Sequence, residues 1–240
     1  MQENTDLNTV IIDIDGVISP HSNRKFYASY IMDIVRCLKS SFKMKPKEIL
    51  KAVKDFKKNN KKGLFNFIYS LSKDKKEFDA FADSLLKKTK YWHILFTSDV
   101  REAFLKTLQN NKIIILTDNL KEHAQQIISK TTGIERHQNL EIYGIEDSLK
   151  NGKFNPKNSE NGIKIFLEKM NLLPEKCLLL DDKKDNIERA KSCGIKTVRV
   201  NSHAGLLAVL NKINHKACDD KTIPDDISKI LYFSRYQKRH

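Results

Sequence analysis

The sequence predicts an α/β protein, in which a parallel sheet is covered by helices and interrupted by one long helical insertion. Three observations support this prediction. Short, unbroken apolar runs alternate along the chain with segments of helical periodicity. Several of the apolar runs end in acidic or hydroxyl side chains, at the strand ends where open α/β sheets place their ligands. Residues 24–90 show helical periodicity alone.

The first predicted strand is Thr9–Ile12, an apolar run typical of a strand that is buried on both faces. It leads into Asp13-Ile14-Asp15-Gly16, which places two carboxylates two residues apart. Side chains at this spacing point to the same side of a strand, so we expect the two carboxylates to lie close together. Such a pair requires a cation or a shared proton to relieve its repulsion. The alternative interpretation is a turn that closes a hairpin.

Residues 24–90 are predicted to form helices inserted after the first strand. Apolar residues recur there at spacings of three and four. They are Phe26, Tyr30, Ile34 and Cys37; Ile49, Val53 and Phe56; Leu64, Phe67, Ile68 and Leu71; and Phe78, Phe81, Leu85 and Leu86. About a hundred residues separate Asp15 from Thr117, far more than one crossover connection needs, so an inserted domain is expected.

The remaining predicted strands complete a five-stranded parallel sheet. They are Lys112–Leu116, Leu140–Tyr143, Cys177–Leu180 and Thr197–Val200. Polar residues follow two of them, namely Thr117, Asp118 and Asn119 after the first and Asp181 and Asp182 after the third. Between these strands, Lys157 precedes an amphipathic helix that stops before Pro174. Taken alone, Thr117 would be a helix cap and Lys157 a solvated loop residue.

In their order along the chain, these motifs resemble those of the haloacid dehalogenase-like superfamily of aspartyl-phosphate phosphotransferases. The matching residues are Asp13-Ile14-Asp15-Gly16, Thr117, Lys157 and Asp181-Asp182. The resemblance spans residues 9 to about 202. It implies a Rossmann-like core formed by residues 1–20 and 92–210, with a helical cap at residues 21–91. Residues 211–240 would then form a C-terminal extension, in which Ile227, Ile230, Leu231 and Phe233 predict a short docking helix.

The resemblance also implies a magnesium-dependent phosphatase that acts on a small phosphorylated metabolite, such as a nucleotide or sugar phosphate. Asp13 would be the nucleophile, and Asp15 the general acid and base. Thr117 and Lys157 would contact the phosphoryl group, and Asp118 and Asn119 would help to bind the substrate. By resemblance, the Mg²⁺ ligands would be Asp13, the backbone carbonyl of Asp15, and Asp182, with Asp181 close behind them.

Other activities on the same fold remain alternatives. A phosphomutase would use the same two acids. A dehalogenase would need the nucleophile Asp13, but its halide leaves without a proton, so Asp15 argues against that activity. A non-catalytic protein that binds nucleic acid is a further alternative, since the formal net charge is +14 and nine lysines lie between Lys43 and Lys62. A solvated helix face explains these lysines more simply, because lysine is abundant throughout the chain.

The composition predicts a cytoplasmic protein that does not enter a membrane. The sequence has no apolar run long enough to span a bilayer, and its first residues lack the basic and apolar regions of a secretory signal. The four cysteines are scattered without the close spacing of a zinc site or a disulfide framework.

Overall fold

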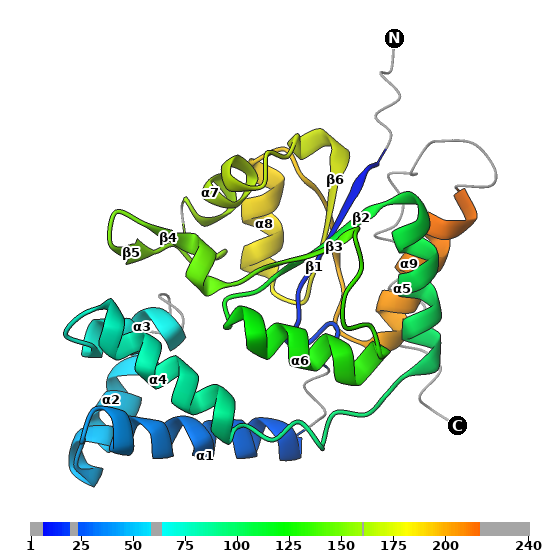
Figure 1. Cartoon of the computed structure of the whole chain (residues 1–240). Coiled ribbons are helices and arrows are strands. Elements are labelled where there is room, and N and C mark those ends of the chain that lie inside the picture. The colour runs from blue at the N-terminus through cyan, green and yellow to red at the C-terminus, as the bar shows by residue number, and fades with distance from the viewer. Residues whose placement is uncertain (1–6, 20–23, 59–63, 160, 217–240) are drawn as a thin grey trace.

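A computed structural model describes residues 7–19, 24–58, 64–159 and 161–216 of the 240-residue chain. A five-stranded parallel sheet of order β3-β2-β1-β6-β7 lies at the centre (Figure 1). Its strands are β1 (Thr9–Ile12), β2 (Lys112–Leu116), β3 (Leu140–Tyr143), β6 (Cys177–Asp181) and β7 (Lys196–Arg199). The predicted α/β fold is confirmed. β6 is one residue longer than predicted, and β7 begins and ends one residue earlier.

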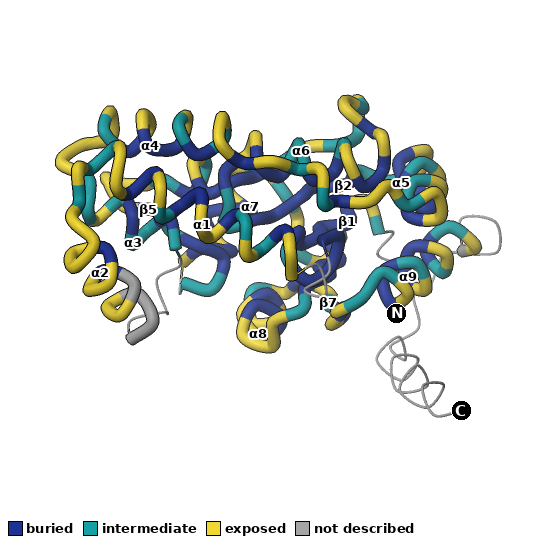
Figure 2. The backbone as a smooth tube through the Cα atoms, turned by 90° about the horizontal axis from the view of Figure 1, so that it is seen from below, coloured by how far each residue is buried: buried dark blue, intermediate teal, exposed yellow. Residues whose placement is uncertain are grey.

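Five helices cover the two faces of the sheet. They are α5 (Ser98–Asn110), α6 (Lys121–Thr132), α7 (Gly162–Lys169), α8 (Lys184–Ser192) and α9 (His203–Lys216). Apolar residues of α5, α6 and α9 pack in one cluster with Val10 and Ile12, whereas those of α7 and α8 pack in another with Ile11. The central strand β1 is thus buried on both sides, as the dark tube of Figure 2 shows. This double burial explains the unbroken apolar sequence of β1.

Four further helices form what we call the helical unit, which lies beside the carboxyl ends of the parallel strands (Figure 1). They are α1 (Arg24–Ser41), α2 (Pro46–Lys58), α3 (Leu64–Leu71) and α4 (Lys75–Lys88). Their apolar faces pack against one another in a cluster separate from those of the sheet. Three residues from the sheet's side, Leu120, Ile145 and Phe154, complete this cluster. The helices predicted for residues 24–90 are therefore present, and most of the predicted apolar residues whose side chains the structure describes lie in this cluster.

A small antiparallel hairpin joins the helical unit to the sheet. It pairs β4 (Leu149–Lys150) with β5 (Lys153–Phe154) and was not predicted from the sequence. Its turn is Asn151-Gly152, with φ angles of 54° and 71°. An Asn-Gly pair accepts such left-handed angles readily and is a strong hairpin signal, so the sequence did contain the information. The hairpin follows a short 3₁₀ turn, Ile145–Ser148, and another 3₁₀ turn, Pro174–Lys176, precedes β6.

The last described helix, α9, crosses the predicted boundary between residues 210 and 211. It packs on α5, where Thr107 Oγ1 and Asn214 Oδ1 lie 3.0 Å apart. The helix predicted around Ile227 and Phe233 lies outside the described residues. Among the described helices, none combines the length and the apolar character that crossing a bilayer requires.

Candidate active site

Asp13 lies directly after β1 and is almost completely buried, with 2% of its surface exposed. Its backbone N–H donates to Leu180 O of the neighbouring strand at 2.9 Å. This hydrogen bond fixes Asp13 at the carboxyl ends of the parallel strands. Its Oδ1 accepts the N–H of Ile14 at 2.7 Å and forms an ion pair with Lys157 Nζ at 2.6 Å. Its Oδ2 is buried and has no hydrogen-bond partner among the described residues. One oxygen of Asp13 is thus held in place while the other is available to a ligand.

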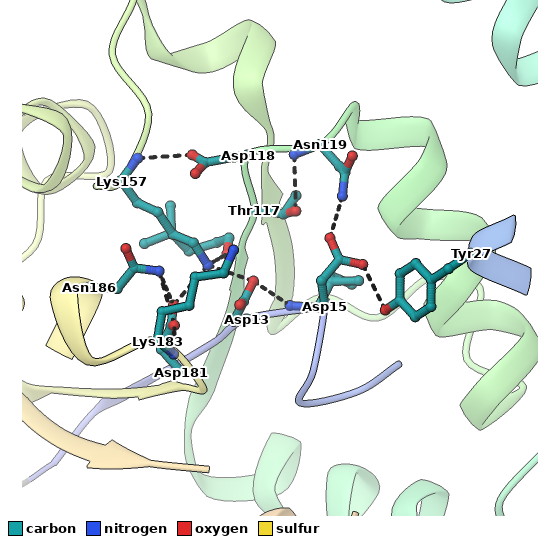
Figure 3. A network of polar contacts seen from close by, with 12 residues as sticks. Asp13, Asp15, Tyr27, Thr117, Asp118, Asn119, Lys157, Asp181, Lys183 and Asn186 are labelled. Atoms are coloured by element: carbon teal, nitrogen blue, oxygen red, sulfur yellow. Dashed lines mark hydrogen bonds and ion pairs between the residues drawn. The ribbon is translucent and has the colours of Figure 1, made fainter. Parts of the chain in front are cut away.

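Asp15 follows two residues later, where the chain turns sharply away from the sheet. Gly16 has a φ of 93°, a backbone conformation that favours glycine. Its N–H donates to Ser19 O at 2.7 Å, which closes the turn. The Asp15 carboxylate accepts hydrogen bonds from Asn119 Nδ2 and from Tyr27 Oη (Figure 3). Asp13 and Asp15 therefore lie at one site, as the spacing predicts, and they do not form a simple hairpin turn.

The segment after β2 supports both acids. Thr117 is buried, and its Oγ1 accepts the N–H of Asn119 at 3.1 Å. Helix α6 begins only at Lys121, so Thr117 is not its cap. Asp118 Oδ1 accepts the backbone N–H of Lys157 at 2.9 Å, and Asn119 contacts Asp15. In this structure the side chains of Asp118 and Asn119 are thus engaged with other residues of the site.

Lys157 is buried, with 4% of its surface exposed, and its amine lies between two carboxylates. Nζ is 2.6 Å from Asp13 Oδ1 and 2.8 Å from Asp181 Oδ2. Burial alone would lower the pKa of Lys157, but the nearby charges of Asp13, Asp181 and Asp118 outweigh it and raise the pKa above its usual value. Lys157 is therefore a buried, positively charged residue and not the solvated lysine that a polar loop would suggest.

The two acidic residues at the end of β6, Asp181 and Asp182, have different environments. Asp181 is fully buried, and both its oxygens accept from Asn186 Nδ2, at 3.0 and 2.9 Å. Its Oδ1 also accepts the N–H of Lys183 at 2.8 Å. Asp182 is partly exposed at the edge of the site, and its backbone carbonyl accepts from Arg199 Nε at 2.8 Å. Asp181 thus lies behind the site, and Asp182 lies nearer to solvent.

Three of these carboxylates are arranged so that they fit a divalent cation. Asp13, Asp181 and Asp182 each offer an oxygen within 4.8 Å of the others. Burial raises the pKa of Asp13 well above its usual value, and the charges of Asp181 and Asp15 raise it further, although Lys157 opposes them. The carboxyl groups gathered here outnumber the Lys157 amine that contacts two of them. Hard carboxylate oxygens and the unpartnered Oδ2 of Asp13 suit a cation such as Mg²⁺.

Two features of the site were not predicted from the sequence. Tyr27, from helix α1, reaches Asp15, and Asn186, from helix α8, holds Asp181. No motif marks Tyr27, because its position depends on how α1 packs against the sheet. Asn186 lies five residues after Asp181, in the first turn of the helix that follows β6. This spacing belongs to the resemblance to the family, but no role at the site was predicted for Asn186.

The fold and the site together define a parallel α/β enzyme with an aspartate at the end of its central strand. A family model described as haloacid dehalogenase-like hydrolase matches residues 7–194. The chain therefore belongs to the haloacid dehalogenase-like hydrolases. The resemblance that the four motifs suggested is thus confirmed at the level of the family.

Individual relatives share smaller parts of the chain or only its fold. "Phosphorylated carbohydrates phosphatase" of Thermotoga maritima is 31% identical over 101 residues, which are 41% of this chain and 43% of that protein. The chain thus matches less than half of that relative's length. Two crystal structures of CbbY from Rhodobacter sphaeroides have the same fold with a TM-score of 0.53, and each match covers 82% of this chain and 87% of the other. One contains xylulose-1,5-bisphosphate at 10% identity, and the other contains phosphate at 11% identity.

Proposed function

We propose that the protein is a magnesium-dependent phosphatase that hydrolyses a small phosphomonoester, such as a sugar phosphate or a nucleotide. The observation that carries this proposal is the pattern of contacts at the Asp13 carboxylate. Its Oδ1 forms an ion pair with Lys157, while its buried Oδ2 has no hydrogen-bond partner among the described residues. The name of the Thermotoga maritima relative supports phosphorylated carbohydrates as the first substrates to test.

The site residues can perform the reaction in two steps. In the first step, the Asp13 carboxylate attacks phosphorus, the ester P–O bond breaks, and Asp15 gives its proton to the leaving alkoxide. In the second step, Asp15 takes a proton from a water molecule, whose oxygen attacks the aspartyl-phosphate and releases inorganic phosphate. Thr117 would donate to a phosphoryl oxygen. The fixed positive charge of Lys157 would neutralise part of the negative charge that builds up.

A bound cation fits the same arrangement. Asp13, the backbone carbonyl of Asp15, and Asp182 would hold Mg²⁺, with Asp181 behind them. When bound, the cation would neutralise charge on the phosphoryl oxygens. In our proposal, Asp181 also keeps Lys157 in place, because its Oδ2 lies 2.8 Å from Nζ.

We also propose that residues 21–91 form a cap over a core made of residues 1–20 and 92–210. The separate apolar cluster of the helical unit supports this division. The contact between Tyr27 of α1 and Asp15 supports a location next to the reacting groups. A cap of this kind would exclude water from the site and select the substrate.

Phosphate release provides the test. The wild-type protein should release phosphate from an aryl phosphate in the presence of Mg²⁺, and exhaustive chelation should abolish the release. Asp13→Asn should lower turnover by about 10³-fold or more with an unchanged melting temperature, because an amide does not attack phosphorus. Near-normal turnover of this variant would exclude Asp13 as the nucleophile. A panel of sugar phosphates and nucleotides then ranks substrates, and product analysis would reveal an isomerised phosphate if the enzyme were a mutase.

A further inference from the structure

The peptide group between Pro156 and Lys157 lies at the start of the loop that brings the Lys157 amine into the site. Its N–H donates to Asp118 Oδ1 at 2.9 Å, a contact that is visible in Figure 3. Its carbonyl oxygen accepts the N–H of Ser159 at 2.8 Å, which folds the loop into a tight turn. Both polar groups of this one peptide are thus held by defined partners.

Gly162, the first residue of α7, is buried against the same peptide group. A Cβ atom at position 162 would lie 2.0 Å from the carbonyl oxygen of Pro156 and 2.7 Å from its carbonyl carbon. Non-bonded atoms do not approach so closely, so a side chain at this position would force the Pro156 carbonyl to move. Gly162 is not among the described glycines with a positive φ. The position therefore requires the small size of glycine and not its conformational freedom.

A movement of the Pro156 carbonyl would be passed on to Lys157. A peptide group is planar and rigid, so a shift of its carbonyl also turns the Lys157 N–H away from Asp118. The Lys157 side chain has little room to absorb such a shift, because it is buried and its surroundings are closely packed. Its amine must reach Asp13 at 2.6 Å and Asp181 at 2.8 Å. A displacement at the start of the loop should therefore disturb the contacts of the amine.

We propose that Gly162 is a positioning residue for Lys157, because it leaves the space that the Pro156–Lys157 peptide needs between α7 and Asp118. This inference rests on the proposed function, in which the Lys157 amine neutralises charge on the phosphoryl group. The carbonyl and the N–H of a trans peptide point in opposite directions. Gly162 thus bounds this peptide on one side while Asp118 holds it on the other. The two residues should therefore act on one quantity, the position of Lys157.

The experiment is a double-mutant cycle with Gly162→Ala, Asp118→Ala and the double variant, measured as kcat/KM for 4-nitrophenyl phosphate. Each single substitution should lower kcat/KM about 10-fold, because a displacement of the order of 1 Å in a positioning group is costly. The double variant should also lose about 10-fold and not about 100-fold, since both substitutions act through the same peptide.

Gly152→Ala is the matched control. Gly152 has a φ of 71°, so alanine is strained there, but an added Cβ would meet no atom within 4 Å. This variant should lower the melting temperature and leave kcat/KM unchanged, which separates a loss of stability from a loss of positioning.

Two results would overturn the inference and leave the proposed function intact. One is full activity of a folded Gly162→Ala variant, and the other is a double variant whose loss equals the product of the single losses. If thermal melts show that Gly162→Ala is unfolded, Pro156→Ala replaces it in the same cycle. That substitution frees the φ angle that proline fixes, so a smaller loss is expected, again without additivity.

Failure of the wild-type protein to hydrolyse phosphate esters would overturn the proposed function. The same cycle is then measured by urea unfolding. A loss of stability in the double variant that is smaller than the sum of the single losses would support the shared peptide, and a loss equal to that sum would overturn the inference.

Discussion

Asp118 shows how one side chain can support the site without reaching the reacting group. Its Oδ1 accepts the backbone N–H of Lys157 at 2.9 Å, and this bond joins the segment after β2 to the loop before α7. The loop places the Lys157 amine 2.6 Å from Asp13. Loss of the acceptor should let the loop move and the amine retreat from Asp13.

We therefore predict that Asp118→Ala lowers kcat/KM for phosphate esters by about 10-fold, because a displacement of the order of 1 Å in a positioning group is costly. Asp118→Asn is the matched control, since its side-chain oxygen can still accept the same N–H, and it should stay within a few-fold of wild type. Steady-state kinetics of both variants provide the measurement. Equal losses in the two variants would show that the charge of Asp118 matters more than its hydrogen bond.

At the residue scale, the sequence predicted the groups at the site better than it predicted their partners. Asp13, Thr117, Lys157 and Asp181 each follow a strand or precede a helix, so local pattern alone brings them to the same edge of the sheet. Tyr27 lies on a helix of the inserted unit, and its contact with Asp15 depends on packing between elements that are distant in sequence. Such packing leaves no local signal.

The hairpin β4–β5 is the element through which the sheet supports the helical unit. The ring of Phe154 lies 4.8 Å from that of Tyr69 and 5.2 Å from that of Phe78, measured between centroids. Its carbonyl accepts from Asn66 Nδ2 at 3.0 Å. Lys157 follows only three residues later, so the same segment contacts both the helical unit and the site.

Phe154→Ala should destabilise the protein by about 3 kcal/mol, since it removes a buried aromatic ring from the cluster of the helical unit. Phe154→Leu should cost about 1 kcal/mol, because it fills most of the same space. Urea unfolding monitored by circular dichroism measures both. A loss below about 1 kcal/mol for Phe154→Ala would show that the hairpin is not important for the stability of the helical unit.

The sequence predicted helices well where apolar residues recur periodically over many residues. It predicted strands well where the strand is buried on both faces. The five strands and the helical character of residues 24–90 follow from such patterns, and the strand ends differ from the predictions by one residue at most. The hairpin was missed because its strands are two residues each, too short to show alternation. Only the Asn151-Gly152 pair marks it.

In the whole molecule, His123 of α6 lies where the helical unit contacts the helices that cover the sheet. Its ring stacks on Tyr30 with the centroids 4.4 Å apart, and its Nδ1 contacts the hydroxyl of Tyr91 at 2.9 Å. The residue is almost completely buried. Burial lowers the pKa of His123 from 6.5 to about 4, because the charged imidazolium would lose its hydration. The ring is therefore neutral in the folded protein near pH 7.

This shift makes stability depend on pH in a defined window. The unfolded chain binds a proton at His123 below about pH 6.5, whereas the folded protein resists binding it until about pH 4. The contribution of the neutral His123 ring to the free energy of unfolding is thus fully present above pH 6.5. It is lost as the pH falls to 4, by about 3 kcal/mol in total. In His123→Phe, the free energy of unfolding should change correspondingly less between these pH values, as urea titrations at several pH values can measure. His215→Gln is the control, since that side chain is exposed on α9. An unchanged slope in His123→Phe would show that other groups cause the pH dependence.

The positions where the chain enters and leaves the helical unit lie together. The rings of Phe26, near the start of α1, and Tyr91, after α4, are 5.9 Å apart, and both contact the ring of His123. The two ends of the helical unit are thus close in space. A short linker could join them at little cost in loop entropy. A chain shortened in this way would retain Asp13, Lys157 and Asp181 on neighbouring strands and loops. It would lose Tyr27 and uncover Phe154. The order of the strands in the sheet would stay the same, because all five of them lie outside the helical unit.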